Sequence, residues 1–294
     1  MSDTFRRRLE DGQVASRARD LDRAQRAYQD ALEVAHDDDE RSQALGGLGV
    51  VHDQLLDRTG ALRHLSEALE LGRRSGSAFL PSRLHDLAVC RMGRSEPVEA
   101  VTLLEEAWPL WEDDGMRAAS VEMLAMAYLD TGDLRSAESA YMQLSALGGV
   151  TDRGDRVLRG QNGRGEALRR AGRHEEAKRV FQNVVEALSG VAQPTRGDQE
   201  QAGVALHNLG VLLLDERPGA ARTFLDQAVT CFVDAFGTAQ HPHVARAKAF
   251  LGRLAAVQGD AGAAEAAYAE ALRLVAADDP VATELVPALR ALPT

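Results

Sequence analysis

The sequence predicts an all-α protein, a right-handed superhelical solenoid of about seven helix-turn-helix hairpins with a capping helix at its C-terminal end. Three observations predict this fold. A helical pattern of small and large residues recurs seven times. A second pattern of small residues precedes each recurrence at a nearly constant distance. Aromatic residues make up only 4% of the chain against 45% hydrophobic residues, so Ala, Leu and Val must build the core, as in close-packed helices.

The second helix of each hairpin carries a small residue, a large apolar residue four positions on, and a small or apolar residue three positions further. Spacings of four and three place all three residues on one helical face. The sets are Ala24, Tyr28, Ala31; Ala61, Leu65, Ala68; Ala100, Leu104, Ala107; Ala137, Tyr141, Leu144; Ala177, Phe181, Val184; Ala221, Leu225, Ala228; and Ala264, Tyr268, Ala271.

The first helix of each hairpin carries a small residue 12 positions before its set, or 11 positions in the sixth repeat. Small residues let two helix axes approach closely, and the large residue then fills the gap between neighbouring hairpins. These small residues are Gly12, Gly49, Ala88, Ala125, Gly165, Gly210 and Gly252.

The turn between the two helices has its own signals. Gly132, Gly172 and Gly259 stand where the first helix should end, which predicts left-handed C-caps. Asp133 and Asp260 follow and are suited to cap the second helix.

These signals place the repeats at about 5–38, 42–75, 81–114, 118–151, 158–191, 203–235 and 245–278. Pro280 suits the first turn of a further helix at about 281–292, which we expect to cover the last repeat. The polar connectors are short loops, so we expect one solenoid domain over residues 1–294.

The pattern resembles the tetratricopeptide repeat family. The resemblance is closest in LHNLGVLLLDERPGAARTFLDQAV (206–229) and AFLGRLAAVQGDAGAAEAAYAEALRL (249–274), and it covers about residues 5–275. The segment FGTAQHPHVA (236–245) makes the last two repeats similar to the longer kind found in kinesin light chains and in sensor portions of bacterial regulators.

The charge balance and hydropathy exclude several classes of protein. The chain has 45 acidic and 34 basic residues, and its net charge of -11 disfavours a general nucleic-acid binder. The sequence contains no apolar run of about 18 residues that could span a membrane. Arg6, Arg7 and Arg8 precede no apolar run, so we expect no secretory signal and a cytoplasmic location.

The sequence shows no catalytic motif. The phosphate-loop, nucleophile-elbow and zinc-helix patterns are all absent, and the glycine-rich GQNGRG (160–165) falls inside a repeat helix. His241 and His243 flank Pro242 without an evident third ligand, and the resemblance explains them as a turn feature. We therefore predict no enzyme, no cofactor and no metal. An enzyme on a repeat scaffold is a further alternative, and nucleic-acid binding through the fifth repeat ranks below it. Trp108 and Trp111 are expected to cap the third hairpin, with an exposed hot spot as the alternative.

Residues 151–182 form a basic island, with nine basic and five acidic residues in an otherwise acidic chain. The family resemblance implies that first-helix residues line the inner wall where ligands lie. Carried over to this sequence, it gives a stripe suited to an acidic or C-terminal carboxylate segment. The alternative is a solvated face held by salt bridges such as Glu175 to Arg179. The stripe consists of Arg159, Asn162, Arg169, His207, Asn208, Arg246 and Arg253.

The resemblance implies a protein or peptide partner, acidic if it uses this stripe. Leu9 and Gln13 stand where chaperone-binding members carry Lys and Asn, so we expect no chaperone tail as ligand. Our main hypothesis is a non-enzymatic module that binds an extended peptide or a helix in its groove. The alternative is a regulatory sensor of a signalling peptide or small ligand. Since the repeats begin by about residue 5, such a sensor is expected to act on a separate partner.

Overall fold

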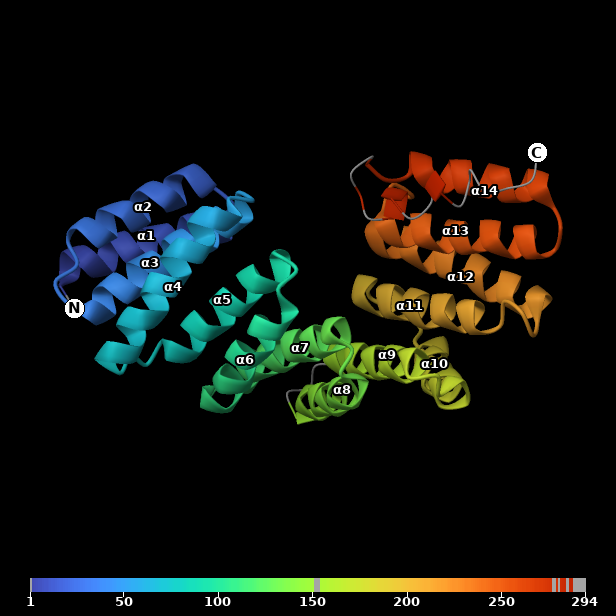
Figure 1. The fold of residues 1–294 in the computed structure, drawn as a ribbon, viewed down its shortest axis with the longest axis horizontal. Helices are drawn as coiled ribbons and strands as arrows, with labels where there is room; N and C mark the ends of the chain where they lie inside the picture. The colour runs from blue at the N-terminus through green and yellow to red at the C-terminus, as the bar shows by residue number, and fades with distance from the viewer. Residues whose placement is uncertain (1, 151–153, 277–278, 280, 284–285, 288–294) are drawn as a thin grey trace. The chain divides into compact units, whose positions relative to one another are not determined.

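A computed structural model describes residues 2–150, 154–276, 279, 281–283 and 286–287, and it contains helices and no strand in these ranges (Figure 1). The all-α prediction is therefore confirmed, and consecutive helices pack against one another as helical hairpins in each part of the chain. The α-helices are α1 (Asp3–Arg17), α2 (Leu21–Glu33), α3 (Asp38–Gln54), α4 (Arg58–Ser75), α5 (Leu80–Gly93), α6 (Pro97–Ala107), α7 (Asp114–Thr131), α8 (Leu134–Val150), α9 (Gly154–Arg170), α10 (His174–Ser189), α11 (Arg196–Leu212), α12 (Pro218–Phe236), α13 (Pro242–Val257) and α14 (Ala261–Arg273); a short 3-10 helix η1 (Trp108–Leu110) follows α6.

The small residues of the first helices lie where the sequence pattern requires close approach. A Cβ added at Gly49 of α3 would overlap the side chain of Leu65 on α4. Tyr28 of α2 covers both Gly12 of its own hairpin and Gly47 of the next, so it fills the gap between two hairpins. In the five repeats whose small residue is a glycine, the large residue of the set lies against that glycine, which explains the spacing of the repeat.

The turns between helices also match the prediction. Gly132, Gly172 and Gly259 have left-handed φ values of 81°, 74° and 80°. Asp133 accepts a hydrogen bond from the Ser136 amide at 3.1 Å, and Asp260 accepts one from the Ala263 amide at 2.9 Å. These carboxylates cap the second helices as expected.

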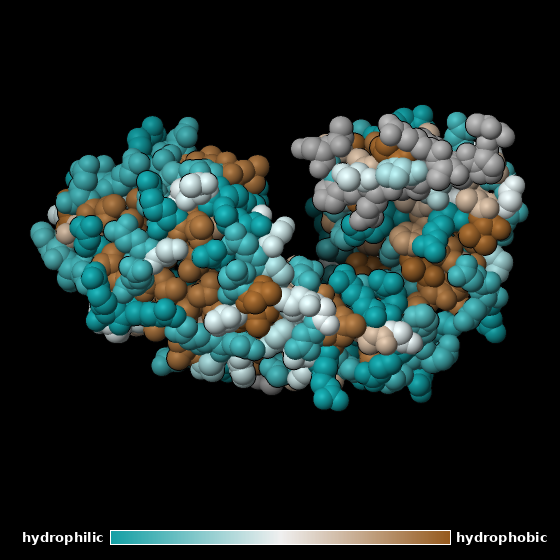
Figure 2. Space-filling model, viewed as in Figure 1, coloured by the Kyte–Doolittle hydropathy of each residue, from teal (hydrophilic) through white to brown (hydrophobic). Residues whose placement is uncertain are grey.

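The chain forms two compact units, residues 1–140 and 141–294. Phe5, Leu65 and Leu84 are fully buried in the first unit, and Phe181 and Leu225 in the second. Figure 2 shows hydrophobic side chains reaching the surface of the first unit in separate patches among hydrophilic ones. The single-domain expectation and the right-handed sense of the solenoid stay predictions.

The C-terminal end is described in part. Residues 281–283 are helical, and Val281 is buried in a cluster with Ala245, Ala249 and Tyr268 of the last repeat. This contact is the one expected of a capping helix. The remainder of the predicted helix at 281–292 lies outside the described residues, apart from 286–287. None of the described helices is long and apolar enough to cross a bilayer.

Candidate functional site

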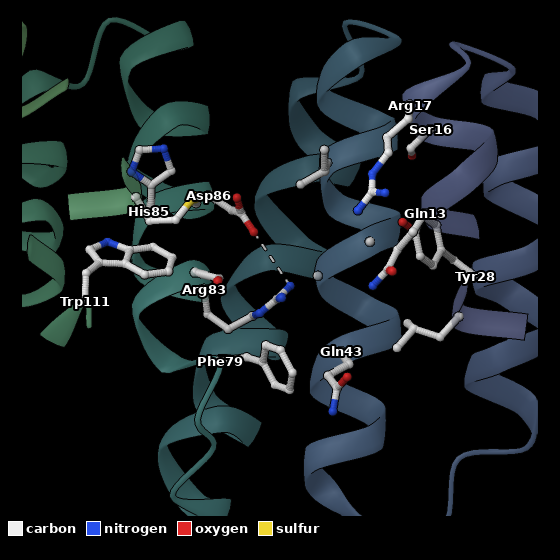
Figure 3. A pocket seen from close by; sticks show the side chains of 16 residues that line it. Gln13, Ser16, Arg17, Tyr28, Gln43, Phe79, Arg83, His85, Asp86 and Trp111 are labelled. Atoms are coloured by element: carbon white, nitrogen blue, oxygen red, sulfur yellow. Dashed lines mark ion pairs between the residues drawn. The ribbon is translucent and has the colours of Figure 1, made fainter. Parts of the chain in front are cut away.

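A pocket of about 440 Å³ lies on the first unit, on the face formed by the first helices of its hairpins. Side chains of α1, α3 and α5 line it, together with Tyr28 of α2, Met116 of α7 and Trp111, which precedes α7 (Figure 3). Arg83 extends from α5 toward the helix that carries Gln43, and Gln13 and Tyr28 lie on the far side. The first helices of three consecutive repeats therefore place polar side chains around one cavity.

Two glycines of α3 form part of the pocket lining. A Cβ added at Gly47 would overlap the Tyr28 ring, and one added at Gly46 would overlap the guanidinium of Arg83. Gly47 makes a close contact with a neighbouring helix, whereas Gly46 accommodates a charged side chain that lies directly on the helix backbone.

Arg83 is the most unusual side chain of the pocket. It is only 9% exposed, and its Nε–H is buried with no hydrogen-bond partner among the described residues. Its charged neighbour is Asp86, whose Oδ2 lies 3.7 Å from Nη1, beyond hydrogen-bond distance. A guanidinium has five N–H donors and is always charged. The pocket thus holds a nearly buried cation with donor capacity that the described residues leave unfilled.

Asp86 titrates unusually as a result of this setting. Burial raises its pKa from 3.8 to about 6, against the opposing attraction of Arg83, and the negative charge of Asp53 adds to the rise. Asp86 is therefore mostly ionised at neutral pH and takes up a proton in mildly acidic solution.

A hydrogen-bonded chain stiffens one wall of the pocket. Trp111 Nε1 donates to Ser120 Oγ at 2.7 Å, and Ser120 Oγ lies 2.9 Å from His85 Nδ1. Because an indole nitrogen only donates, Ser120 Oγ accepts from Trp111, and the same oxygen lies within hydrogen-bond distance of the His85 ring. Burial lowers the pKa of His85, so the ring is neutral. Ser120 is fully buried and its hydroxyl is committed twice, so this pair positions the wall and offers no nucleophile.

The pocket also has an apolar side. Phe79 and Met116 are 44% and 42% exposed, and Trp111 is 9% exposed. Trp108 packs against the core cluster of the third hairpin, as the sequence predicted. Trp111 is likewise covered, and it adds a pocket wall that the sequence did not indicate.

The seven residues predicted from the sequence lie in the second unit. Two of the amides bond inside the protein: Asn162 Nδ2 donates to the main-chain oxygen and to Oε1 of Gln201, both at 3.0 Å, and Asn208 donates to the carbonyl of Val204 at 3.1 Å. Asn162 is 4% exposed. These amides join helices or bond within one helix.

The predicted basic side chains divide into two groups. Arg159 pairs with Asp155 at 3.0 Å, and Arg169 pairs with Glu166 at 2.8 Å, so acidic residues of the same helix neutralise both. Arg246 and Arg253 are exposed, with no ion pair among the described residues. The unneutralised charge of the predicted stripe is therefore concentrated on α13.

His207, the remaining predicted residue, is packed against Phe250 with ring centroids 5.1 Å apart. Burial lowers its pKa to about 3, and the positive charge of Arg246 contributes. The ring is therefore neutral, and its Nδ1 is buried without a partner among the described residues.

The two histidines at the start of α13 are part of an aromatic stack. His241 lies on Phe236 with centroids 3.5 Å apart, and His243 lies on Phe232 at 5.0 Å. Burial lowers the pKa of His243 to about 4. In the part of the chain that the structure describes, no three His, Cys, Asp or Glu side chains come together as a metal site.

Sequence reasoning missed Arg83 and Asp86. The available signal was a charged pair three positions apart inside the otherwise apolar helix LPSRLHDLAVC. It was weak, because such pairs also occur on solvated helix faces.

Comparison with known proteins identifies the class of this protein. The family model described as tetratricopeptide repeat matches residues 9–78, 122–192 and 220–279, more than half of the chain. The chain belongs to the tetratricopeptide repeat family. No curated protein matches the sequence.

Solved structures agree on the fold at low sequence identity. A tetratricopeptide repeat protein from Parabacteroides merdae has 13% identity and a TM-score of 0.69, over 98% of this chain and 100% of that one. The PH0952 protein of Pyrococcus horikoshii, a signal transduction ATPase with a tetratricopeptide repeat sensor, has 12% identity and a TM-score of 0.74, over 96% of this chain and 44% of that one. A structure of putative kinesin light chain repeats from Podosopora anserina has 19% identity and a TM-score of 0.55, over 67% of this chain and 98% of that one. The predicted resemblance to kinesin light chain-like repeats is thereby confirmed.

Proposed function

We propose that this protein is a non-enzymatic interaction module that binds an extended peptide or a helix of a partner protein in the pocket of the first unit. The observation that carries the proposal is Arg83, a nearly buried guanidinium whose donors the described residues leave unfilled. Family membership supports it, since repeats of this kind serve protein–protein interaction. The packed hairpins hold the pocket in place before binding, which reduces the ordering cost of association.

Site-specific photo-crosslinking tests the proposal. A photoreactive residue placed at Gln13, which is exposed and lines the pocket, should capture a partner in the native host. The same residue at Val98, which is 65% exposed on α6 and does not line the pocket, is the control. We expect a protein crosslinked from Gln13 and not from Val98, at a level reduced by Gly46→Ala. Equal capture from both positions would contradict the proposal.

A second contact is proposed on the second unit, for an acidic segment of the partner. It consists of the stripe predicted from the sequence, namely Arg159, Asn162, Arg169, His207, Asn208, Arg246 and Arg253. The exposure of Arg246 and Arg253 supports it. Replacing both with Glu should weaken partner capture. An unchanged yield of captured partner would show that this surface does not bind it.

The alternative function is a regulatory sensor that binds a signalling peptide or small ligand and acts on a separate partner. The similarity of PH0952, which carries a tetratricopeptide repeat sensor, favours it as second candidate. Native mass spectrometry of the gently purified protein distinguishes the two functions. A sensor would be detected with a small bound ligand, whereas an interaction module would be detected with a bound protein. A cytoplasmic location is proposed with either function. The free thiols of Cys90 and Cys231 are compatible with a reducing compartment.

A further inference from the structure

The least explained feature of the molecule is the guanidinium of Arg83 on the backbone of Gly46. We propose that this guanidinium is the receptor for a carboxylate group of the peptide ligand, and that an apolar side chain next to this carboxylate lies against Phe79, Trp111 and Met116. The inference rests on the proposed peptide-binding function and names the chemical group that the pocket recognises.

The donor set of the pocket suits a carboxylate. A guanidinium offers parallel N–H groups that match the two oxygens of a carboxylate, and such charge-assisted pairs are the stronger hydrogen bonds of proteins. Arg83 Nε is buried without an acceptor, and Asp86 lies too far from Nη1 for a hydrogen bond. A ligand carboxylate in the pocket would give the guanidinium an acceptor that the described residues do not supply.

The charges around the pocket favour a monoanion over a phosphate. Arg83 and Arg17 contribute positive charge, Asp86 contributes negative charge, and His85 is neutral. A phosphate dianion bound to Arg83 would lie beside the Asp86 carboxylate, which is 3.7 Å from the same guanidinium. Repulsion between these charges is larger for a dianion than for a carboxylate.

The apolar part of the pocket sets the second requirement. Phe79 and Met116 are each more than 40% exposed, and Trp111, which lines the same pocket, is 9% exposed. Figure 3 places Phe79 and Trp111 on the same side of the pocket as the base of the Arg83 side chain. A carboxylate on Arg83 would therefore carry its neighbouring side chain toward this surface. Both a C-terminal residue and an acidic residue beside an apolar one have this chemistry.

Gly46 supplies a selective variant. A methyl group at this position would occupy the place of Arg83 Nη1, the mobile end of a long side chain, so Gly46→Ala should displace the guanidinium and keep its charge. Arg83→Lys keeps the charge and removes the fork. Gly219→Ala is the matched control, because a Cβ there meets nothing within 4 Å.

The experiment is a ¹⁹F NMR titration with three probes: N-trifluoroacetyl-leucine, its amide, and N-trifluoroacetyl-glutamic acid α-amide. We expect the wild type and Gly219→Ala to bind one of the two carboxylate probes about tenfold more tightly than leucine amide, as a charge-assisted bidentate pair implies. Gly46→Ala and Arg83→Lys should lose most of this preference while retaining native far-UV circular dichroism. The tighter acid identifies the source, a chain terminus for leucine and an acidic side chain for glutamate.

Equal binding of acids and amide would overturn the inference, and so would an unchanged preference in Gly46→Ala and Arg83→Lys. Stronger competition by inorganic phosphate than by either acid would also refute the choice of carboxylate. The photo-crosslinking from Gln13 does not depend on a carboxylate. If crosslinking is observed but the titration shows no preference for the acids, the peptide-binding function is supported and the carboxylate as its recognition group is refuted.

Discussion

Arg83 lies across the backbone of Gly46, so that a methyl group added to the glycine would overlap the Nη1 atom of the arginine. The two residues belong to neighbouring repeats, on α5 and α3, and the absence of one side chain gives the other its position. Close packing in this family therefore does more than join helices here, because it also brings a charged group into a pocket.

Two glycines of α3 should respond differently to the same substitution. A Cβ at Gly49 would overlap the buried Leu65, so Gly49→Ala should destabilise the protein by about 1–3 kcal/mol, as overpacked cores do. Gly46→Ala meets only the mobile end of Arg83 and gains helix propensity, so its stability should stay within about 1 kcal/mol of wild type. Urea unfolding followed by tryptophan fluorescence measures both. Equal losses would show that Arg83 is held rigidly.

Replacing Leu56 with glycine should raise the free energy of unfolding. It is 74% exposed with a left-handed φ of 62°, at the turn where later repeats have Gly132, Gly172 and Gly259. Leu56→Gly relieves the steric strain and contacts little, so we expect a gain of about 0.5–1 kcal/mol in thermal or urea unfolding. Leu55→Gly is the control, because Leu55 has an ordinary φ of -80° and glycine there should lower stability. A loss in both variants would contradict the strain argument.

Asp86 should make stability depend on pH. Because its pKa is about 6 in the folded protein and 3.8 ordinarily, the folded state binds the proton more tightly, and this stabilisation is lost as the pH rises through 6. The charges that act on it are Arg83 on its own helix and Asp53 on α3. Asp86→Asn should therefore be more stable than wild type at pH 8, by at most about 3 kcal/mol for a pKa difference of about 2.

The difference between Asp86→Asn and wild type should shrink between pH 7 and pH 4 and vanish below that range. Urea unfolding at pH 4, 6 and 8 gives the comparison, with Asp226→Asn on the exposed face of α12 as the control. A constant difference at all three values would mean that Asp86 titrates normally.

Replacing Asn162 should lower the free energy of unfolding, whatever its effect on partner binding. Its amide bonds Gln201 twice from a buried position, so Asn162→Ala should destabilise the protein by about 1–3 kcal/mol, the loss expected when buried polar groups lose their partner. Asn208→Ala, which removes a half-buried bond within one helix, should have a smaller effect. Circular dichroism during urea unfolding measures both. A neutral Asn162→Ala would show that its hydrogen bonds to Gln201 do not stabilise the fold.

The repeat could be predicted from the sequence because it depends on local chemistry. Gly132 adopts the left-handed turn and Asp260 caps its helix as expected, since neighbouring residues in the chain determine both features. The pairing of Gly49 with Leu65 follows equally from a fixed spacing within one hairpin.

The site could be predicted only in part, because it depends on how one repeat meets the next. Asn162 belongs to a polar stripe, but its hydrogen-bond partner Gln201 lies 39 residues further along the chain. The spacing of residues within one helix does not tell whether a polar side chain faces the groove or contacts the next repeat. Arg83 was missed for the same reason, since its position follows from the glycine on the preceding first helix.

Hydrogen–deuterium exchange with the crosslinked partner, or a peptide from it, tests the central claim most directly. If the pocket of the first unit is the binding site, bound protein should exchange more slowly in α3 and α5, and Gly46→Ala should abolish that protection. Protection confined to α9, α11 and α13, unaffected by Gly46→Ala, would contradict the account and place the ligand on the stripe of the second unit.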